Sequence, residues 1–224
     1  MKFFLDTASL KDIAYWQTMG LVDGVTTNPV ILAKAGVDPY ARLKDILSLG
    51  DFPVSAQLTA TDKDGMLAQA TRFASLGQNI VIKVPACPLG FSVASALKSE
   101  GVRVSITLVF TPSQALPFLR VHVDYVSLFV AVTEDAGLQQ DHSMTTLRTA
   151  IDAMGSKTQL ICCSIRTPDH LWRAVCANPH VITVPPSCWE DTFRNPLFAT
   201  WSQRFLAQWS DMPQDLRAAY DGEE

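Results

Sequence analysis

The sequence predicts an α/β fold, a single (β/α)8 TIM barrel with one additional C-terminal helix. Eight short apolar runs alternate with segments of helical periodicity, which is the pattern of a parallel barrel. The chain has 224 residues, enough for one large core but few for two domains. No linker or low-complexity tract divides it, so residues 1–224 are expected to form one domain.

The predicted strands are short and apolar, as expected of parallel strands that are covered on both faces. The run at 80–84 is the clearest, because four β-branched residues lie between Gly77 and Pro85. The strands are expected at residues 3–6, 25–26, 54–58, 80–84, 104–109, 125–130, 159–163 and 181–184.

The segments between the strands have apolar residues at helical spacing. Thr61 is expected to cap one helix, with Asp62 and Asp64 in its first turn. Pro117 should kink or shorten the helix that starts at Thr111. Besides the helix that starts at Thr111, helices are expected at residues 10–18, 29–35, 39–49, 61–76, 89–98, 144–154, 167–176 and 186–193.

Residues 197–210 are predicted to form a helix beyond the eight units, followed by a polar tail at 211–224. Trp201, Phe205, Leu206 and Trp209 are spaced along one face of this helix, which therefore needs a surface to pack on. Two surfaces are equally compatible with the pattern, the barrel of the same chain and a neighbouring subunit.

The charge distribution excludes several classes of partner. The net charge is −4, from 18 Lys and Arg against 22 Asp and Glu, and no block of like charge occurs. Nucleic acid and anionic membranes are therefore not expected partners, and small-molecule chemistry is favoured. The N-terminus is too short in apolar residues for a signal peptide, and no run approaches a membrane span, so a cytoplasmic protein is expected.

The cysteines and histidines do not indicate a metal site. The five cysteines are odd in number and none is spaced like a zinc ligand, so reduced packing thiols are expected. The four histidines are scattered without a His-x-x-x-His pair. No metal-dependent mechanism is predicted.

Lys83 interrupts the apolar run at 80–84. A lysine is costly to bury, because apolar neighbours cannot replace the hydration of its ammonium group. One interpretation is an edge-strand lysine that reaches solvent or pairs with a carboxylate. The other is an amine kept largely neutral by desolvation, which is nucleophilic and can form a Schiff base with a carbonyl.

Side-chain alternation favours the second interpretation. The more uniformly apolar face of each strand is assigned outward, towards the helices, which places Lys83 inside the barrel. On the fifth strand the same rule places Leu108 outward and Val109 inward. The residues predicted to point inward are Phe4, Asp6, Ser55, Gln57, Val81, Lys83, Ser105, Thr107, Val109, Tyr125, Ser127 and Phe129.

Five of these inward residues are polar and lie in the middle or later part of their strands: Asp6, Gln57, Lys83, Thr107 and Ser127. Barrel enzymes build their sites at the C-terminal ends of the strands, whereas a purely structural barrel fills its interior with Val, Ile and Leu. An amine beside an acid, an amide and hydroxyls has what carbinolamine chemistry needs, because protons must move and a water must be held.

Seven motifs, in order along the chain, resemble the transaldolase and fructose-6-phosphate aldolase family, in particular its small branch. They are Phe4-Leu5-Asp6-Thr7, Asp23-Gly24-Val25-Thr26-Thr27-Asn28-Pro29, Pro53-Val54-Ser55-Ala56-Gln57, Val81-Ile82-Lys83-Val84-Pro85, Thr107-Leu108-Val109-Phe110, Tyr125-Val126-Ser127-Leu128-Phe129-Val130 and Ser164-Ile165-Arg166-Thr167-Pro168.

The resemblance implies a class I aldolase barrel that needs no cofactor. Lys83 would form the Schiff base and Asp6 would be the general acid and base. Gln57 and Thr107 would hold the catalytic water. The substrates would be a ketose donor and an aldehyde acceptor, with transfer of a three-carbon dihydroxyacetone unit. The implied substrate-binding residues are Thr26, Thr27, Asn28, Ser127, Phe129, Ser164 and Arg166.

The chain departs from the family pattern at three positions. Gln57 resembles the fructose-6-phosphate aldolases, whereas Phe129 resembles the transaldolases. Val132 stands where the family has a phosphate-binding arginine, although Ser164 and Arg166, the other half of that grip, are present. Two explanations stay open: a less charged substrate, or another arginine from a nearby loop.

Several functions are compatible with the sequence. Transfer is slightly favoured over free aldol cleavage, because Phe129 has no hydroxyl to handle water. An isomerase or lyase would use Asp6 as a base and Lys83 as an electrophile. A catalytically idle barrel that serves in assembly is a third possibility, suggested by Val132 and Pro117. Small members of the family form rings, so a homo-oligomer with the last helix as a docking arm is expected by analogy.

Overall fold

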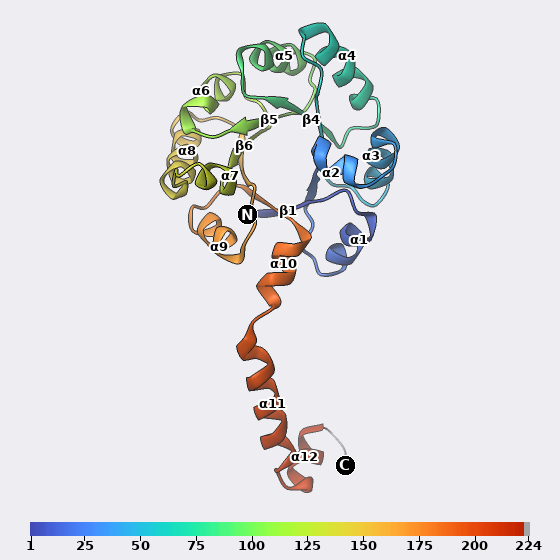
Figure 1. The fold of residues 1–224 in the computed structure, drawn as a ribbon, viewed down its shortest axis with the longest axis vertical. Coiled ribbons are helices and arrows are strands. Elements are labelled where there is room, and N and C mark those ends of the chain that lie inside the picture. The colour runs from blue at the N-terminus through green and yellow to red at the C-terminus, as the bar shows by residue number, and fades with distance from the viewer. Residues whose placement is uncertain (222–224) are drawn as a thin grey trace.

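The computed structural model describes residues 1–221. Its eight parallel strands close into a barrel in sequence order, and β1 completes the ring by pairing with β8. Helices surround the barrel on its outside (Figure 1). The predicted (β/α)8 barrel with a C-terminal helix is confirmed.

The strands agree with the predicted runs to within one residue at each end. They are β1 (Lys2–Asp6), β2 (Gly24–Thr26), β3 (Val54–Gln57), β4 (Ile80–Pro85), β5 (Val104–Val109), β6 (Tyr125–Phe129), β7 (Gln159–Cys163) and β8 (Val181–Val184).

Most of the helices were predicted, but α7 and α12 were not. The helices are α1 (Leu10–Thr18), α2 (Pro29–Lys34), α3 (Pro39–Leu47), α4 (Lys63–Ala74), α5 (Pro88–Ser99), α6 (Pro112–Arg120), α7 (Ala131–Asp135), α8 (Asp141–Ala153), α9 (Pro168–Cys176), α10 (Pro186–Phe193), α11 (Pro196–Ser210) and α12 (Gln214–Asp221). None of the described helices is both long and apolar enough to span a membrane.

Two apolar cores lie on the two sides of the barrel wall. The larger lies between strands and helices and includes the outward residues of β4, Ile80, Ile82 and Val84. The smaller lies inside the barrel and consists of Phe4, Val81, Tyr125, Ile161, Cys163 and Val181, with Phe129 packed against it. The predicted facing of β1, β4 and β6 is confirmed. Because the apolar inner residues mostly come early in their strands, the polar ones gather towards the C-terminal ends.

The predicted facing of Leu108 and Val109 is wrong. The pairing of β5 with β6 shifts register between Ile106 and Val109. Leu108 adopts a left-handed backbone conformation with φ 59° and is 40% exposed, while Val109 is fully buried in the outer core. An irregularity of this kind moves all later side chains to the opposite face, which an alternation rule cannot anticipate.

Two predictions about helix ends also need correction. Asp62, not Thr61, caps α4, and its Oδ1 accepts a hydrogen bond from the Gly65 amide at 2.8 Å. An aspartate satisfies the free amides of a first turn as well as a threonine does. The helix α6 continues through Pro117 to Arg120, so the proline does not end it.

Gly90 allows α5 to lie directly against the end of β4. A Cβ atom at this position would come 1.9 Å from the carbonyl oxygen of Pro85. Only glycine fits such an approach of a helix to a strand end. The glycine therefore supports the strand that carries Lys83.

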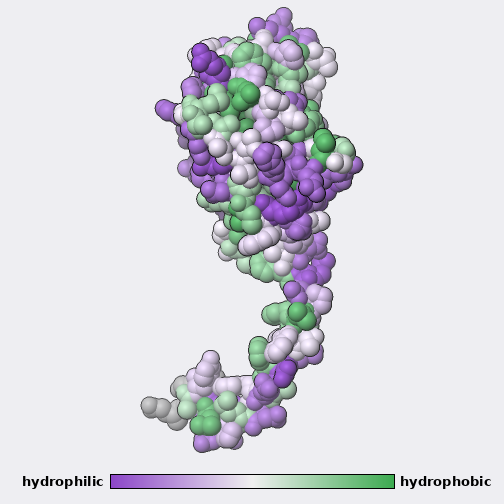
Figure 2. Space-filling model, turned by 90° about the vertical axis from the view of Figure 1, so that its left-hand side faces the viewer, coloured by the Kyte–Doolittle hydropathy of each residue, from purple (hydrophilic) through white to green (hydrophobic). Residues whose placement is uncertain are grey.

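The C-terminal helices differ in how they contact the barrel. Trp189 of α10 is buried and packs edge-on against Phe3, with ring centroids 5.2 Å apart. By contrast, α11 has no buried residue, and α11 and α12 lead away from the barrel (Figures 1 and 2). Packing of α11 on its own barrel, one of the two expected alternatives, is not observed.

Candidate active site

Lys83 lies inside the barrel near the C-terminal end of β4. Its residue is 7% exposed, and its Nζ donates a hydrogen bond to the Thr27 carbonyl at 3.2 Å. The strand β4 is paired with β3 on one side and β5 on the other, so Lys83 is not on an edge strand. Within residues 1–221 it forms no ion pair. The interpretation as an exposed or carboxylate-paired edge lysine is therefore wrong.

Asp6, at the end of β1, is the carboxylate that lines the same pocket as Lys83. The Thr26 hydroxyl donates a hydrogen bond to its Oδ1 at 2.6 Å. Burial raises the pKa of Asp6 above its ordinary value, while the positive charge of Lys83 and the Thr26 hydrogen bond act in the opposite direction. Asp6 is therefore set up to hold a proton more readily than an exposed aspartate.

A pocket of about 140 Å³ brings most of the candidate residues together. Two of its residues, Cys163 and Thr183, were not predicted. Both follow from alternation on β7 and β8, because Ile161 and Val181 point into the barrel two residues earlier. The predicted residues that line this pocket are Asp6, Thr26, Asn28, Lys83, Ser127, Phe129 and Ser164.

Thr183 and Cys163 make different contributions to this pocket. The Thr183 hydroxyl shares a hydrogen bond with the Thr26 hydroxyl, so the hydrogen bonds at Asp6 link β1 to both of its neighbours, β2 and β8. The Cys163 thiol donates to the Leu128 carbonyl at 3.3 Å, and burial raises its pKa far above the ordinary value. The thiol therefore stays neutral and is a poor nucleophile.

Three other predicted residues lie close to Lys83 but do not line the pocket: Gln57 and Thr107 in the neighbouring strands, and Thr27 just after β2. Gln57 is the β3 register partner of Lys83, and Thr107 pairs with Pro85 two residues further along β4. Thr27 is held by Ser55, because its hydroxyl donates to the Ser55 carbonyl at 2.6 Å and its amide to the Ser55 hydroxyl at 3.1 Å. Thr27 thus offers Lys83 its carbonyl oxygen rather than its side chain.

Asn28 and Phe129 border the pocket from two sides. Asn28 caps α2, and its Oδ1 accepts a hydrogen bond from the Ile31 amide at 3.0 Å. Its amide group keeps two donors for a ligand. Phe129 packs against Phe110 with ring centroids 5.3 Å apart, which forms an apolar wall.

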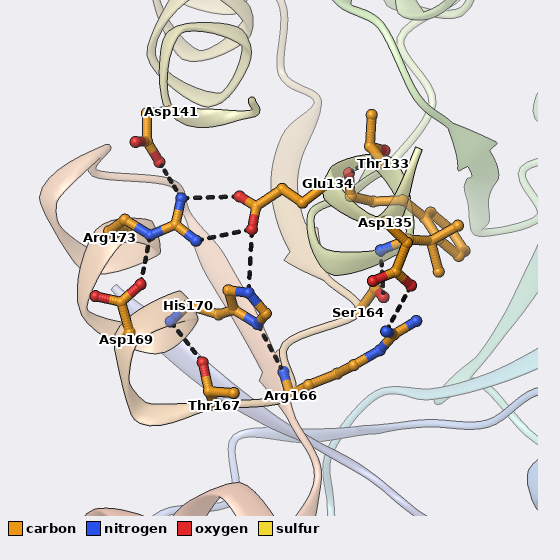
Figure 3. A network of polar contacts seen from close by, with 12 residues as sticks. Thr133, Glu134, Asp135, Asp141, Ser164, Arg166, Thr167, Asp169, His170 and Arg173 are labelled. Atoms are coloured by element: carbon orange, nitrogen blue, oxygen red, sulfur yellow. Dashed lines mark hydrogen bonds and ion pairs between the residues drawn. The ribbon is translucent and has the colours of Figure 1, made fainter. Parts of the chain in front are cut away.

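The structure does not bring Arg166 into this pocket. Its guanidinium pairs with Asp135 of α7 at 2.6 Å, and its side chain is about half exposed (Figure 3). Ser164 lies between the two regions: it lines the pocket, and its Oγ accepts a long hydrogen bond from the Val132 amide at 3.4 Å. Arg166 therefore lies outside the pocket that most of the other expected substrate-binding residues line.

Next to Arg166, Arg173 holds three helices together. It contacts Glu134 through two hydrogen bonds, at 2.8 and 2.9 Å, and also Asp141 and Asp169 (Figure 3). Hydrogen bonding to Arg173 lowers the pKa of Glu134. The sequence carries no signal for this cluster, because the three acids come from α7, the start of α8 and α9.

A second pocket, of about 490 Å³, opens on the other side of Asp6. Asp6 lines it together with Lys11 of α1, Lys34 of α2 and Arg42 of α3. Sequence reasoning missed these three cations, because they come from three different helices and form no cluster along the chain. Within residues 1–221, no three His, Cys, Asp or Glu side chains are grouped so that they could hold a metal ion.

Comparison with known proteins gives a consistent result. The model of a family described as "Transaldolase/Fructose-6-phosphate aldolase" matches residues 3–220. A "Probable transaldolase" of Exiguobacterium sibiricum is 37% identical over 215 residues, covering 96% of this chain and all of the relative. Proteins with the same description from Geobacter sulfurreducens (36% over 214 residues; 96% and 100% covered) and Coprothermobacter proteolyticus (38% over 213 residues; 95% and 98% covered) are similar as well.

Proposed function

Because the chain belongs to the transaldolase and fructose-6-phosphate aldolase family, we propose that it is a class I enzyme whose Lys83 forms a Schiff base with a ketose. It would transfer a three-carbon dihydroxyacetone unit from a sugar phosphate to an aldehyde acceptor. One observation carries the proposal: the Lys83 amine is buried, lacks a carboxylate partner within the described chain, and shares a pocket with Asp6.

The proposed reaction begins with attack of the Lys83 amine on the C2 carbonyl, and an N–H proton passes to the carbonyl oxygen to give a carbinolamine. Protonated Asp6 gives its proton to the C2 hydroxyl, water leaves, and an iminium remains. The Asp6 carboxylate then accepts the C4 hydroxyl proton as the C3–C4 bond breaks. The electron pair moves into the iminium, an aldehyde leaves, and an enamine stays on Lys83. The reverse sequence with a second aldehyde completes the transfer.

The raised pKa of Asp6 supports both of its proposed roles, because a group that first donates and then accepts a proton must hold that proton more readily than an ordinary aspartate. Gln57 and Thr107, beside the C-terminal half of β4, are proposed to hold the departing or attacking water. Asn28 and Ser127 are proposed to bind the hydroxyls of the donor, since both line the pocket with Lys83.

Phe129 favours transfer over free aldol cleavage. Its ring and that of Phe110 present an apolar wall without a hydroxyl that could activate water against the enamine. Gln57 is the feature that favours the alternative, an enzyme like the fructose-6-phosphate aldolases. Measuring release of dihydroxyacetone from fructose 6-phosphate with and without an acceptor aldehyde distinguishes the two activities.

The test of the Schiff base is trapping with borohydride. The protein is incubated with fructose 6-phosphate, sedoheptulose 7-phosphate or dihydroxyacetone, reduced, digested and mapped by mass spectrometry. An adduct on the peptide that contains Lys83 is expected, and unmodified Lys98 in the same digest is the internal control. If none of the three donors gives an adduct, the Schiff-base proposal is wrong, and the isomerase or the catalytically idle barrel remains as the explanation.

A homo-oligomer is proposed as the assembled form. The helix α11 presents Leu197, Phe198, Phe205 and Leu206 to solvent, all more than half exposed. An apolar helix without a surface in its own chain is best covered by another copy of the same chain.

A further inference from the structure

The positive charges near the site are distributed unevenly between its two sides. On the side of Val132, the arginines are already neutralised. Arg166 pairs with Asp135, and Arg173 contacts Glu134, Asp141 and Asp169 (Figure 3). An anion that approached this side would have to compete with carboxylates that these arginines already bind.

On the other side, the three cations that line the pocket of about 490 Å³ have no such partners. Lys11, Lys34 and Arg42 take part in none of the ion pairs formed within residues 1–221. Asp6 is the only carboxylate in the described lining of the pocket. One carboxylate thus stands against three cations. The pocket is therefore positively charged.

Arg42 is the most firmly placed of the three cations. Its Nη1 donates a hydrogen bond to the Ala8 carbonyl at 3.0 Å, which fixes the guanidinium against the segment after β1. Its Nε is buried and has no hydrogen-bond partner within the described chain. A buried donor without a partner is costly, so the contact with Ala8 does not fully satisfy this guanidinium.

Asp6 connects this basic pocket to the Lys83 pocket, because it lines both. In the proposed reaction the donor carbon C2 is bonded to Lys83 and the C4 hydroxyl meets Asp6. With C4 at Asp6, the next carbons of the sugar lie beside the basic pocket, which Asp6 also lines. The basic pocket is the cavity that opens there.

We propose that Lys11, Lys34 and Arg42 bind the phosphate group at the end of the sugar remote from C2. The identity of the sugar rests on the proposed function, but the binding of a phosphate anion does not. Two ammonium groups and a guanidinium fork are the side chains that proteins use for phosphate. These side chains would supply the positive charge that is lost where Val132 replaces the phosphate-binding arginine of the family.

The first test measures binding of inorganic phosphate by isothermal titration calorimetry. Replacement of both lysines, Lys11→Gln with Lys34→Gln, should weaken binding by about 3-fold to 30-fold, as expected for two partly exposed charge contacts. The matched control is Lys44→Gln with Lys63→Gln, which removes the same charge from exposed positions outside the pocket. The control should bind phosphate like the unmodified protein.

The variant Arg166→Gln tests whether phosphate instead binds on the side of Val132 and Arg166. Phosphate binding should be unchanged in this variant, because Asp135 already occupies the guanidinium. Loss of binding in Arg166→Gln, unchanged binding in the double lysine variant, or no phosphate binding by the unmodified protein would each overturn the proposal.

A second measurement separates failure of the pocket from failure of the proposed function. Borohydride trapping is compared with dihydroxyacetone, which has no phosphate, and with fructose 6-phosphate. The double lysine variant should require a higher fructose 6-phosphate concentration for half-maximal trapping, by a factor similar to its loss of phosphate binding. Equal requirements in both proteins would overturn the phosphate pocket, whereas absence of any adduct in the unmodified protein would overturn only the Schiff base.

Discussion

The Thr26 hydroxyl donates a hydrogen bond of 2.6 Å to Asp6 Oδ1 and thereby joins the C-terminal ends of β1 and β2. This contact stabilises the ionised form of Asp6 and acts against the burial that raises the pKa of this group. The pKa of Asp6 is therefore set by burial, which raises it, and by the Lys83 charge and the Thr26 hydrogen bond, which lower it. Removing one of them shifts it in a known direction.

Thr26→Val should raise the pKa of Asp6 further, because the variant loses the donor without adding space for water. If ionised Asp6 must accept the C4 proton, the acidic limb of the pH profile of kcat moves to higher pH. The profile is measured for cleavage of fructose 6-phosphate. Thr183→Val is the control, since Thr183 contacts Thr26 and forms no hydrogen bond with Asp6 among the described residues. A smaller shift is expected there, and equal shifts would contradict this account.

Asp6→Asn should reduce kcat by about 10²-fold to 10⁴-fold, the usual range for loss of a general acid or base. The amide keeps an acceptor for Thr26 but cannot exchange a proton. The same substitution should increase the free energy of unfolding at neutral and alkaline pH, although it reduces kcat. The folded protein raises the pKa of Asp6 above 3.8, so the contribution of this group to stability is complete below that pH and is lost as pH rises through the folded value.

The stability difference can be checked by thermal unfolding at two pH values. At about pH 8 Asp6→Asn should melt at a higher temperature than the unmodified protein, and at about pH 4 the difference should shrink. A variant that melts at a lower temperature at the higher pH would show that the Asp6 carboxylate is better solvated in the folded state than its burial indicates.

The sequence was most informative where strands are regular. The inward position of Lys83 follows from the aliphatic set Ile80, Ile82 and Val84, and the structure buries that set in the outer core. The same rule failed at Leu108, where the backbone leaves the β region and the alternation shifts. Regular pairing can be predicted from a two-residue period, but a local irregularity in one strand cannot.

The surroundings of the site were harder to predict than the barrel interior. Asp135 neutralises Arg166 from α7, a five-residue helix without a clear periodic signal. Lys11, Lys34 and Arg42 line one pocket only because α1, which follows β1, and α2 and α3, which both follow β2, border the same opening. Such convergence depends on loop paths, which single-residue patterns do not encode.

Lys83→Met should abolish both borohydride trapping and turnover, because no other lysine lines the pocket of about 140 Å³ within the described chain. Methionine fills a similar volume and removes a buried nitrogen whose single hydrogen bond is to the Thr27 carbonyl. The variant is therefore expected to be at least as stable as the unmodified protein in urea unfolding. Lys98→Met, which breaks the Lys98–Asp124 pair instead, is the control that should keep trapping. An adduct formed by Lys83→Met would assign the Schiff base to another lysine.

The exposed face of α11 predicts an oligomer that can be dissociated without unfolding the barrel. Phe205→Asp with Leu206→Asp should convert the oligomer into a monomer, because two charges cannot be buried in an apolar contact. Since α11 has no buried residue, the circular dichroism of the barrel should be unchanged. Light scattering measures the mass, and Gln203→Asp with Gln208→Asp adds the same charge at polar positions of the same helix. The glutamine variant should remain oligomeric, and a monomeric unmodified protein would refute the docking role of α11.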